Sequence, residues 1–121
     1  MAINENQNLL GKLIIVLRRH EESVATLTTN EWAELFTEVQ WATGRLREAF
    51  APDHFNYAFL QNEDRHVHFH VIPRYAGTRR IASTEFRDAA WPAHYEVGVT
   101  KAVSPETMQA IRDALVVAAP R

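Results

Sequence analysis

The chain has no cysteine among its 121 residues, only four glycines and five prolines, and a formal net charge of −2. The absence of cysteine excludes a disulfide framework and a metal site with thiolate ligands. So few glycines and prolines, with 46% hydrophobic and 23% charged residues, exclude a disordered or fibrous chain. The small net charge argues against binding to a nucleic-acid polymer through bulk charge.

Long apolar runs are also missing. The longest span residues 13–17 and 114–119, far short of the ~20 residues that cross a bilayer, and no signal-peptide pattern opens the chain. We therefore expect a cytoplasmic protein without a membrane partner. Residues 1–121 contain no repeat and no linker-like stretch, so the chain is predicted to form a single domain with one modest core.

Two helices are predicted from the spacing of apolar residues and from capping signals. The Thr28–Glu31 capping box precedes a long helical pattern over about 29–50, and Ser104 with Pro105 begins a final helix that runs to about Ala118. The aromatic residues Trp32, Phe36 and Trp41 of the long helix are expected to pack in the core.

Strands are predicted before and after the long helix in the sequence. A buried strand is expected over 12–18, and strands over 55–61 and 66–72 are expected to form a hairpin, the second of them stopped by Pro73. Residues 76–84 are expected to be a loop and residues 95–99 an edge strand. Together with the helices, these strands indicate the α+β class.

What the sequence does have is histidine: three of its six histidines fall in the segment His66-Val67-His68-Phe69-His70-Val71-Ile72. Because successive side chains of a strand point to opposite faces, His66, His68 and His70 are expected to share one face and the apolar residues the other. No Asp or Glu occurs from Arg65 to Thr84, whereas four arginines do: Arg65, Arg74, Arg79 and Arg80.

Three interpretations of this histidine cluster follow from the residues themselves. Imidazoles are metal ligands, although the acidic residues that often complete such a site are sparse here. A neutral imidazole can instead attack phosphorus while its neighbours bind oxygens and move protons, and the local arginines favour an anionic substrate of this kind. The third interpretation is a solvated strand face without function.

The segment 66–72 matches the His-φ-His-φ-His-φ-φ signature, where φ is apolar, of the histidine triad (HIT) superfamily of nucleotide hydrolases and transferases. Residues 11–20 and 27–31 resemble the strand, basic turn and helix start of these proteins. Asn56 to Asn62 and the Pro73-Arg74-Tyr75 ending resemble the bacterial branch labelled diadenosine tetraphosphate hydrolase-like.

This resemblance implies a HIT-like fold, with an antiparallel sheet of about five strands, one long and one C-terminal helix, and a homodimer with a joined sheet. It implies hydrolysis of a nucleoside 5′-phosphate derivative, of the dinucleoside polyphosphate or phosphoramidate type, through a nucleotidyl-histidine intermediate, without a metal or other cofactor. His68 takes the place of the nucleophile. His70 is expected to contact phosphate oxygens and the leaving group, and the His66 backbone carbonyl to hold the other ring nitrogen of His68.

Substrate contacts are expected from Asn62, Lys12 and Arg74. Two departures from the family pattern leave alternatives open: Lys12 stands where many members carry a fourth histidine, and the turn 63–65 is shorter than the phosphate-binding loop of the best-known members. The alternatives are a catalytically weak or inactive nucleotide-binding HIT protein and a His-ligated metal hydrolase.

Overall fold

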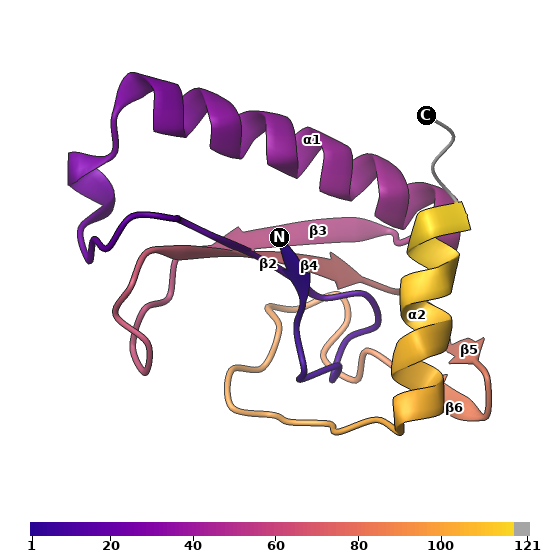
Figure 1. The fold of residues 1–121 in the computed structure, drawn as a ribbon. Helices are drawn as coiled ribbons and strands as arrows, with labels where there is room; N and C mark the ends of the chain where they lie inside the picture. Colours follow the sequence, from indigo (N-terminus) through magenta and orange to yellow (C-terminus); the bar gives the residue numbers. More distant parts are fainter. Residues whose placement is uncertain (118–121) are drawn as a thin grey trace.

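The long helix α1 (Thr29–Phe50) lies across one face of an antiparallel sheet, and α2 (Pro105–Val117) crosses the end of that sheet (Figure 1). The computed structural model describes residues 1–117. The main sheet has the strand order β1-β2-β4-β3. Its strands are β1 (Ala2–Ile3), β2 (Leu13–Val16), β3 (His54–Ala58) and β4 (His68–Arg74).

A second sheet and one short helix complete the elements of the described residues. β5 (Arg79–Ile81) pairs with β6 (Thr84–Phe86), and a 3₁₀ helix spans Val24–Thr26. The expected antiparallel α+β fold with one long and one C-terminal helix is confirmed. The strands divide into a four-stranded and a two-stranded sheet, rather than forming one sheet of about five.

Both helices begin where their caps predict. The Thr28 hydroxyl accepts a hydrogen bond from the Glu31 N–H at 3.1 Å, and the Glu31 carboxylate accepts one from the Thr28 N–H at 2.9 Å. These reciprocal bonds satisfy two N–H groups at the start of α1. The Ser104 hydroxyl accepts from the Thr107 N–H at 3.1 Å in α2. The predicted end of this helix at Ala118 lies outside the described residues.

Several strand predictions were wrong in detail: β2 ends at Val16 and β3 at Ala58, short of the predicted ends at residues 18 and 61. β4 begins at His68 and continues to Arg74, so that Pro73 lies inside the strand, opposite Phe55. Because β2 pairs with β4 only as far as Val71, Pro73 has a strand on one side alone, where a proline is tolerated. Residues 79–86 form a hairpin instead of a loop.

The predicted edge strand over 95–99 is absent, and these residues are turn and irregular structure. Gly98 has a φ of 95°, which breaks an extended backbone, and the Val99 carbonyl accepts a hydrogen bond from the Asn6 side chain at 3.0 Å. The segment is therefore held by the N-terminal loop rather than by a neighbouring strand.

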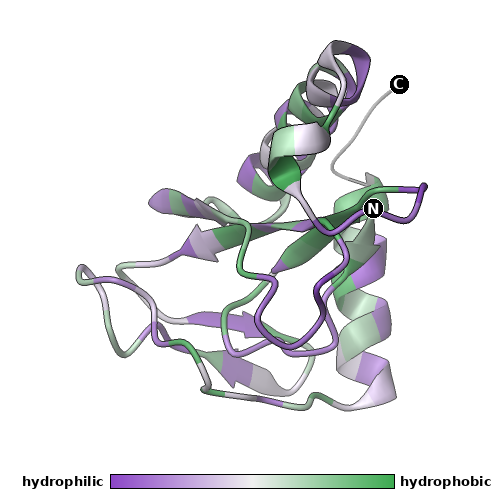
Figure 2. Ribbon diagram, turned by 90° about the vertical axis from the view of Figure 1, so that its left-hand side faces the viewer, coloured by the Kyte–Doolittle hydropathy of each residue, from purple (hydrophilic) through white to green (hydrophobic). Residues whose placement is uncertain are grey.

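The core lies between the sheet and the C-terminal half of α1. Leu46 and Phe50 of α1 pack with Leu13 and Val71 of the sheet and with Ile111 of α2. Figure 2 shows apolar residues concentrated where the helices meet the strands, and hydrophilic residues along the N-terminal loop.

The aromatic residues in the first part of α1 do not belong to this core, contrary to the prediction. Trp32, Phe36 and Trp41 are 42%, 63% and 43% exposed. The cause is visible in Figure 1, where α1 diverges from the sheet toward its N-terminus; the buried residues of α1 all lie from Ala42 onward. Neither helix of residues 1–117 is both long and apolar enough to cross a membrane.

Candidate functional site

His68 and His70 lie side by side on β4, on the face of the sheet that points away from α1. Cross-strand pairing places them opposite Val16 and Ile14, whereas Leu13 and Ile15 point into the core with Val71. Their ring centroids are 4.9 Å apart with the rings nearly perpendicular, and both side chains are half-buried. The predicted alternation of imidazole and apolar faces is confirmed for these two histidines.

The orientation of the His68 ring is fixed by a backbone carbonyl. Nδ1 of His68 lies 2.7 Å from the carbonyl oxygen of His66. A carbonyl only accepts, so Nδ1 carries the proton and donates. In the neutral ring Nε2 is then unprotonated and its lone pair is available for attack on an electrophile.

The ring of His66 serves a different purpose. Its Nε2 lies 2.7 Å from the Leu17 carbonyl, and its Nδ1 accepts a long hydrogen bond of 3.4 Å from the Glu21 N–H. These partners assign a neutral ring protonated at Nε2. His66 precedes β4, and its ring stacks on the His20 ring with 5.6 Å between the ring centroids. Both nitrogens of the His66 ring are hydrogen-bonded to backbone groups of the protein. The strand predicted to begin at His66 begins only at His68, and the His66 carbonyl lies where the resemblance implies, against Nδ1 of His68.

Lys12 lies on the histidine face immediately before β2. Its ammonium donates to the Asn8 side chain at 2.8 Å, and burial lowers its pKa. The pKa of His70 is lowered to about 4, first by burial and then by the charges of His68 and Lys12. His70 is therefore neutral at pH 7, and Lys12 supplies the positive charge beside it.

Arg74 does not take the phosphate-binding role expected of it. Its guanidinium donates to Asp88 through Nε at 2.6 Å and Nη2 at 3.2 Å, to Asn56 at 2.8 Å, and to the Ala93 carbonyl at 2.7 Å. The side chains of Arg74 and Asp88 are each 2% exposed. Because its guanidinium is enclosed and bonded to these protein groups, Arg74 ties β4 to the segment after β6.

A family model for the HIT domain matches residues 7–77, which is more than half of the chain. The chain belongs to the HIT domain family. A comparison with curated proteins found no match.

Solved structures of histidine triad proteins share the fold of this HIT domain. One from Sinorhizobium meliloti 1021 has a TM-score of 0.78 and 23% identity, over 97% of this chain and 80% of that one. One from Bradyrhizobium japonicum has a TM-score of 0.75 and 27% identity, over 95% and 79%. A hypothetical histidine triad nucleotide-binding protein from Sulfolobus tokodaii strain 7 has a TM-score of 0.69 and 16% identity, over 96% and 74%.

Other residues expected near the triad of this HIT domain are placed as follows. Asn62 is exposed in the connection between β3 and β4. Arg79 donates to the Phe50 and Ala51 carbonyls at the end of α1, at 3.1 and 3.0 Å, and Arg80 pairs with Glu85 at 2.9 Å. These two arginines thus serve the fold around α1 and β6.

Sequence reasoning did not find the groups that hold His66, Lys12 and Arg74 in place. Leu17 and Glu21 act on His66 through their backbone, which no residue-type pattern reveals. Asn8 precedes Lys12 by four residues in an irregular loop, and Asp88 is separated from Arg74 by two short strands. The only sequence signal for Asp88 was its position among the acidic residues that follow the acid-free window 65–84.

The contacts of the triad histidine rings do not favour the alternative of a metal site. Within residues 1–117, no group of three or more His, Asp or Glu side chains is arranged to hold a metal ion. Both nitrogens of His66 are bonded to backbone groups, so the triad histidines do not offer three imidazole ligands.

The HIT domain also has a groove of about 670 Å³ on the opposite face of the sheet. Ile15, Val67 and Phe69 line it from the sheet side and Leu35 from α1, where the helix diverges from the strands. The groove is thus separated from His68 and His70 by the sheet itself.

Proposed function

We propose that this HIT protein is a nucleotide hydrolase that acts on a nucleoside 5′-phosphate derivative. Nε2 of His68 attacks the phosphorus next to the nucleoside, and the bond to the leaving group breaks with its electron pair going to the leaving oxygen or nitrogen. Water then attacks the nucleotidyl-histidine, releases the nucleoside monophosphate and restores the neutral imidazole.

The observation that carries this proposal is the hydrogen bond of 2.7 Å between Nδ1 of His68 and the His66 carbonyl. It selects the tautomer whose Nε2 can attack without first losing a proton. The same carbonyl favours the positive charge that the ring acquires in the intermediate, since an N–H donor on a charged ring forms a stronger hydrogen bond.

The neighbouring groups supply charge and contacts for the phosphate. His70 is 4.9 Å from His68 between ring centroids and remains neutral, so it can contact phosphate oxygens and the leaving group without repelling the charged intermediate. Lys12 provides a cation on the same face. Asn62 completes the proposed substrate contacts from the loop before β4, and no metal takes part.

The substrate class is proposed from the resemblance to the bacterial diadenosine tetraphosphate hydrolase-like branch. It comprises dinucleoside polyphosphates and nucleoside phosphoramidates, whose P–O or P–N bond lies next to a nucleoside monophosphate. A cytoplasmic location remains a prediction of this proposal.

The decisive experiment compares the parent protein with His68→Ala on diadenosine tetraphosphate and on adenosine phosphoramidate. We expect the parent to release AMP and the variant to lose about 10³-fold or more in kcat, as variants without a nucleophile do. A quenched reaction should also contain protein that is one AMP heavier by mass spectrometry, and His68→Ala should not form it. Equal rates for parent and variant would refute the assignment.

A second function, nucleotide binding without efficient turnover, is favoured by one observation. Lys12 is a point charge that binds phosphate in both the ground state and the transition state, whereas a histidine at this position can also donate or accept a proton. Tight binding of AMP by calorimetry together with no product after long incubation would favour this second function over hydrolysis.

The proposal includes a homodimer, which two exposed features support. β3 is one of the two edge strands of the main sheet, so its outer side can pair with a second copy. Trp32, Phe36 and Trp41 on α1 and Tyr57 on β3 are exposed by 42%, 63%, 43% and 47%. An aromatic surface of this kind is typical of a protein interface.

Sedimentation of Phe36→Glu tests the dimer. Burying a carboxylate without a partner in an apolar interface is unfavourable, so we expect the parent to sediment as a dimer and the variant as a monomer. Val97→Glu is the matched control, because Val97 is 69% exposed in the segment between β6 and α2. A parent that sediments as a monomer at micromolar concentration would contradict this part of the proposal.

A further inference from the structure

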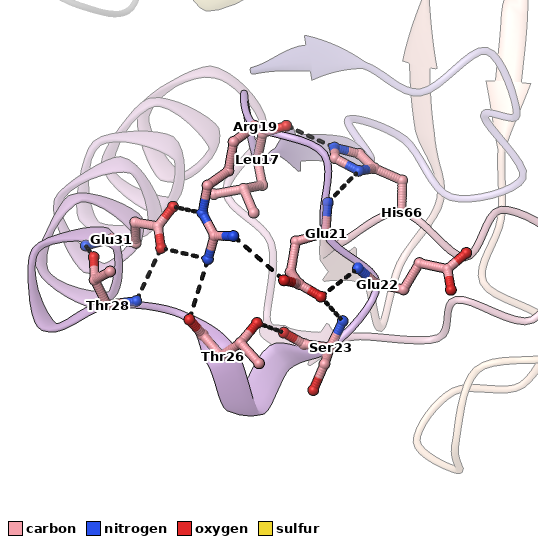
Figure 3. Close-up of polar contacts among 9 residues, drawn as sticks. All are labelled: Leu17, Arg19, Glu21, Glu22, Ser23, Thr26, Thr28, Glu31 and His66. Atoms are coloured by element: carbon pink, nitrogen blue, oxygen red, sulfur yellow. Dashed lines mark hydrogen bonds and ion pairs between the residues drawn. The ribbon is translucent and has the colours of Figure 1, made fainter.

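Arg19 binds two residues of the segment that precedes α1 and one residue in the first turn of α1 (Figure 3). Its guanidinium forms a bidentate pair with Glu31 in the first turn of α1, at 2.8 and 2.9 Å. It also donates to the Thr26 carbonyl at 3.1 Å and to the Glu21 carboxylate at 3.3 Å. One side chain thus joins both ends of the turn 19–26 to the start of the long helix.

The two carboxylates are themselves fixed by the backbone. Glu21 accepts hydrogen bonds from the N–H groups of Glu22 and Ser23, at 2.9 and 3.0 Å. Glu31 accepts from the Thr28 N–H as part of the capping box. The Ser23 N–H is the largest cause that lowers the pKa of Glu21 to about 2, and the Arg19 guanidinium, followed by the Thr28 N–H, lowers the pKa of Glu31 to about 2. Both carboxyls are therefore ionised throughout the pH range of a neutral enzyme.

The strand end and turn that Arg19 fastens also hold His66 and Val67. Leu17 and Glu21 provide the two partners of the His66 ring. Their backbones further pair with Val67, through Leu17 N–H to the Val67 carbonyl at 3.2 Å and Val67 N–H to the Glu21 carbonyl at 2.8 Å. Leu17 and Glu21 therefore hold both the His66 side chain and the Val67 backbone, which flank the His66 carbonyl that orients the His68 ring.

We propose that Arg19 is a positioning residue for the nucleophile: it holds Leu17 and Glu21 in place on His66, whose carbonyl orients the His68 ring. The proposal rests on the proposed hydrolase function for its kinetic consequence. Only an arginine suits the position, because its planar fork reaches partners in three directions, whereas a lysine is a single point charge.

Arg19 touches neither histidine that faces the substrate, so its removal should affect alignment rather than binding. We expect Arg19→Ala to lower kcat about tenfold while KM changes less than twofold, since small displacements of a nucleophile reduce rates steeply. Arg19→Lys should lose nearly as much. Arg80→Ala is the control, because it breaks an exposed arginine–carboxylate pair of similar length, 2.9 Å, and should leave both constants within twofold of the parent.

A double-mutant cycle shows whether Arg19 and Glu31 act as a unit. Glu31→Gln keeps an acceptor for the capping box but loses the ion pair. If the two side chains act only through each other, the double variant Arg19→Ala/Glu31→Gln should lose no more kcat than either single variant. Multiplicative losses would overturn the shared positioning role. Melting curves of every variant confirm that the folded protein is being compared.

A second readout does not depend on turnover. Long-range ¹H–¹⁵N spectra of the histidine side chains should show His68 protonated at Nδ1 in the parent. In Arg19→Ala, signals of the other tautomer should appear, and Arg80→Ala should match the parent. An unchanged His68 pattern in Arg19→Ala would overturn the positioning role even if kcat falls. A parent protein that cleaves no nucleotide would refute the hydrolase function alone, because the tautomer pattern still tests the positioning of His68.

Discussion

Replacing Asp88 with Asn tests the position that the structure gives to Arg74. The Arg74 guanidinium and the Asp88 carboxylate are each 2% exposed and meet through two hydrogen bonds. The substitution keeps the size of residue 88 but removes its charge. The guanidinium then stays buried with only neutral acceptors, which are Asn56, the Ala93 carbonyl and the one amide oxygen left at residue 88.

The expected loss of stability is large for a single polar substitution. Removing one partner of a buried ion pair costs about 3–5 kcal/mol, because the remaining charge is left without compensation in a region that water cannot reach. For a chain of 121 residues this lowers Tm by roughly 10 °C or more. If Arg74 bound phosphate instead, the same substitution would change nucleotide affinity more than stability.

Urea unfolding followed by circular dichroism at pH 7 measures this effect. Glu85→Gln serves as the control, because its pair with Arg80 is 54% and 62% exposed and exposed pairs contribute about 0.2–1 kcal/mol. A loss below about 1 kcal/mol for Asp88→Asn, similar to that of the control, would refute the buried pair as a structural tie between β4 and the segment after β6.

Three further outcomes are expected. Gly11→Ala should lower the free energy of unfolding by about 2–4 kcal/mol, because the φ of Gly11 is 83° and a Cβ would lie 2.7 Å from the buried Leu46 side chain. Gly44→Ala, with open space around a helical glycine, should instead stabilise by about 0.5–1 kcal/mol in the same urea assay. His70 should titrate near pH 4 by NMR, and Lys12→Gln should raise that midpoint. Because a histidine in the unfolded chain has a pKa of about 6.5, only the unfolded state gains a proton between pH 6.5 and pH 4. The contribution of His70 to the free energy of unfolding is therefore full above pH 6.5 and falls as the pH is lowered toward 4.

Local signals in the sequence predicted the elements that depend on local contacts. The capping box of Thr28 and Glu31 marks the start of α1, and both of its hydrogen bonds form. Alternation along β4 correctly separates His68 and His70 from Val71. These features rely on residues close together in the chain, whose geometry follows from helix and strand periodicity.

The errors arose where distant segments decide the structure. The strand was expected to begin at His66, but the Val67 backbone bonds to Leu17 and Glu21, and β4 begins only at His68. Trp32 and Phe36 follow a helical apolar pattern, yet periodicity cannot tell whether the covering surface is the chain's own sheet or another molecule.

Three arginines of the window 65–84 were also misjudged, because groups from outside this window bind them. The window 65–84 contains arginines and no acid, which suggested an arginine-rich phosphate site. In the fold, Arg74 is neutralised by Asp88 and Arg80 by Glu85, while Arg79 binds carbonyls at the end of α1. Local charge along the sequence therefore overstated the positive potential that these residues offer to a substrate.

Lys12, an expected substrate contact, lies beside His70 in the fold. It is held by Asn8 on the histidine face, and its charge contributes to the lowered pKa of His70. A half-buried lysine is a stronger electrostatic partner for phosphate than an exposed one, because less water screens it. Burial has removed part of the hydration of Lys12, and under the proposed function a bound phosphate would replace it with a charge-assisted hydrogen bond. Under the proposed function, Lys12 is thus a cation beside a neutral His70, at a position where the resemblance implies a histidine in many members.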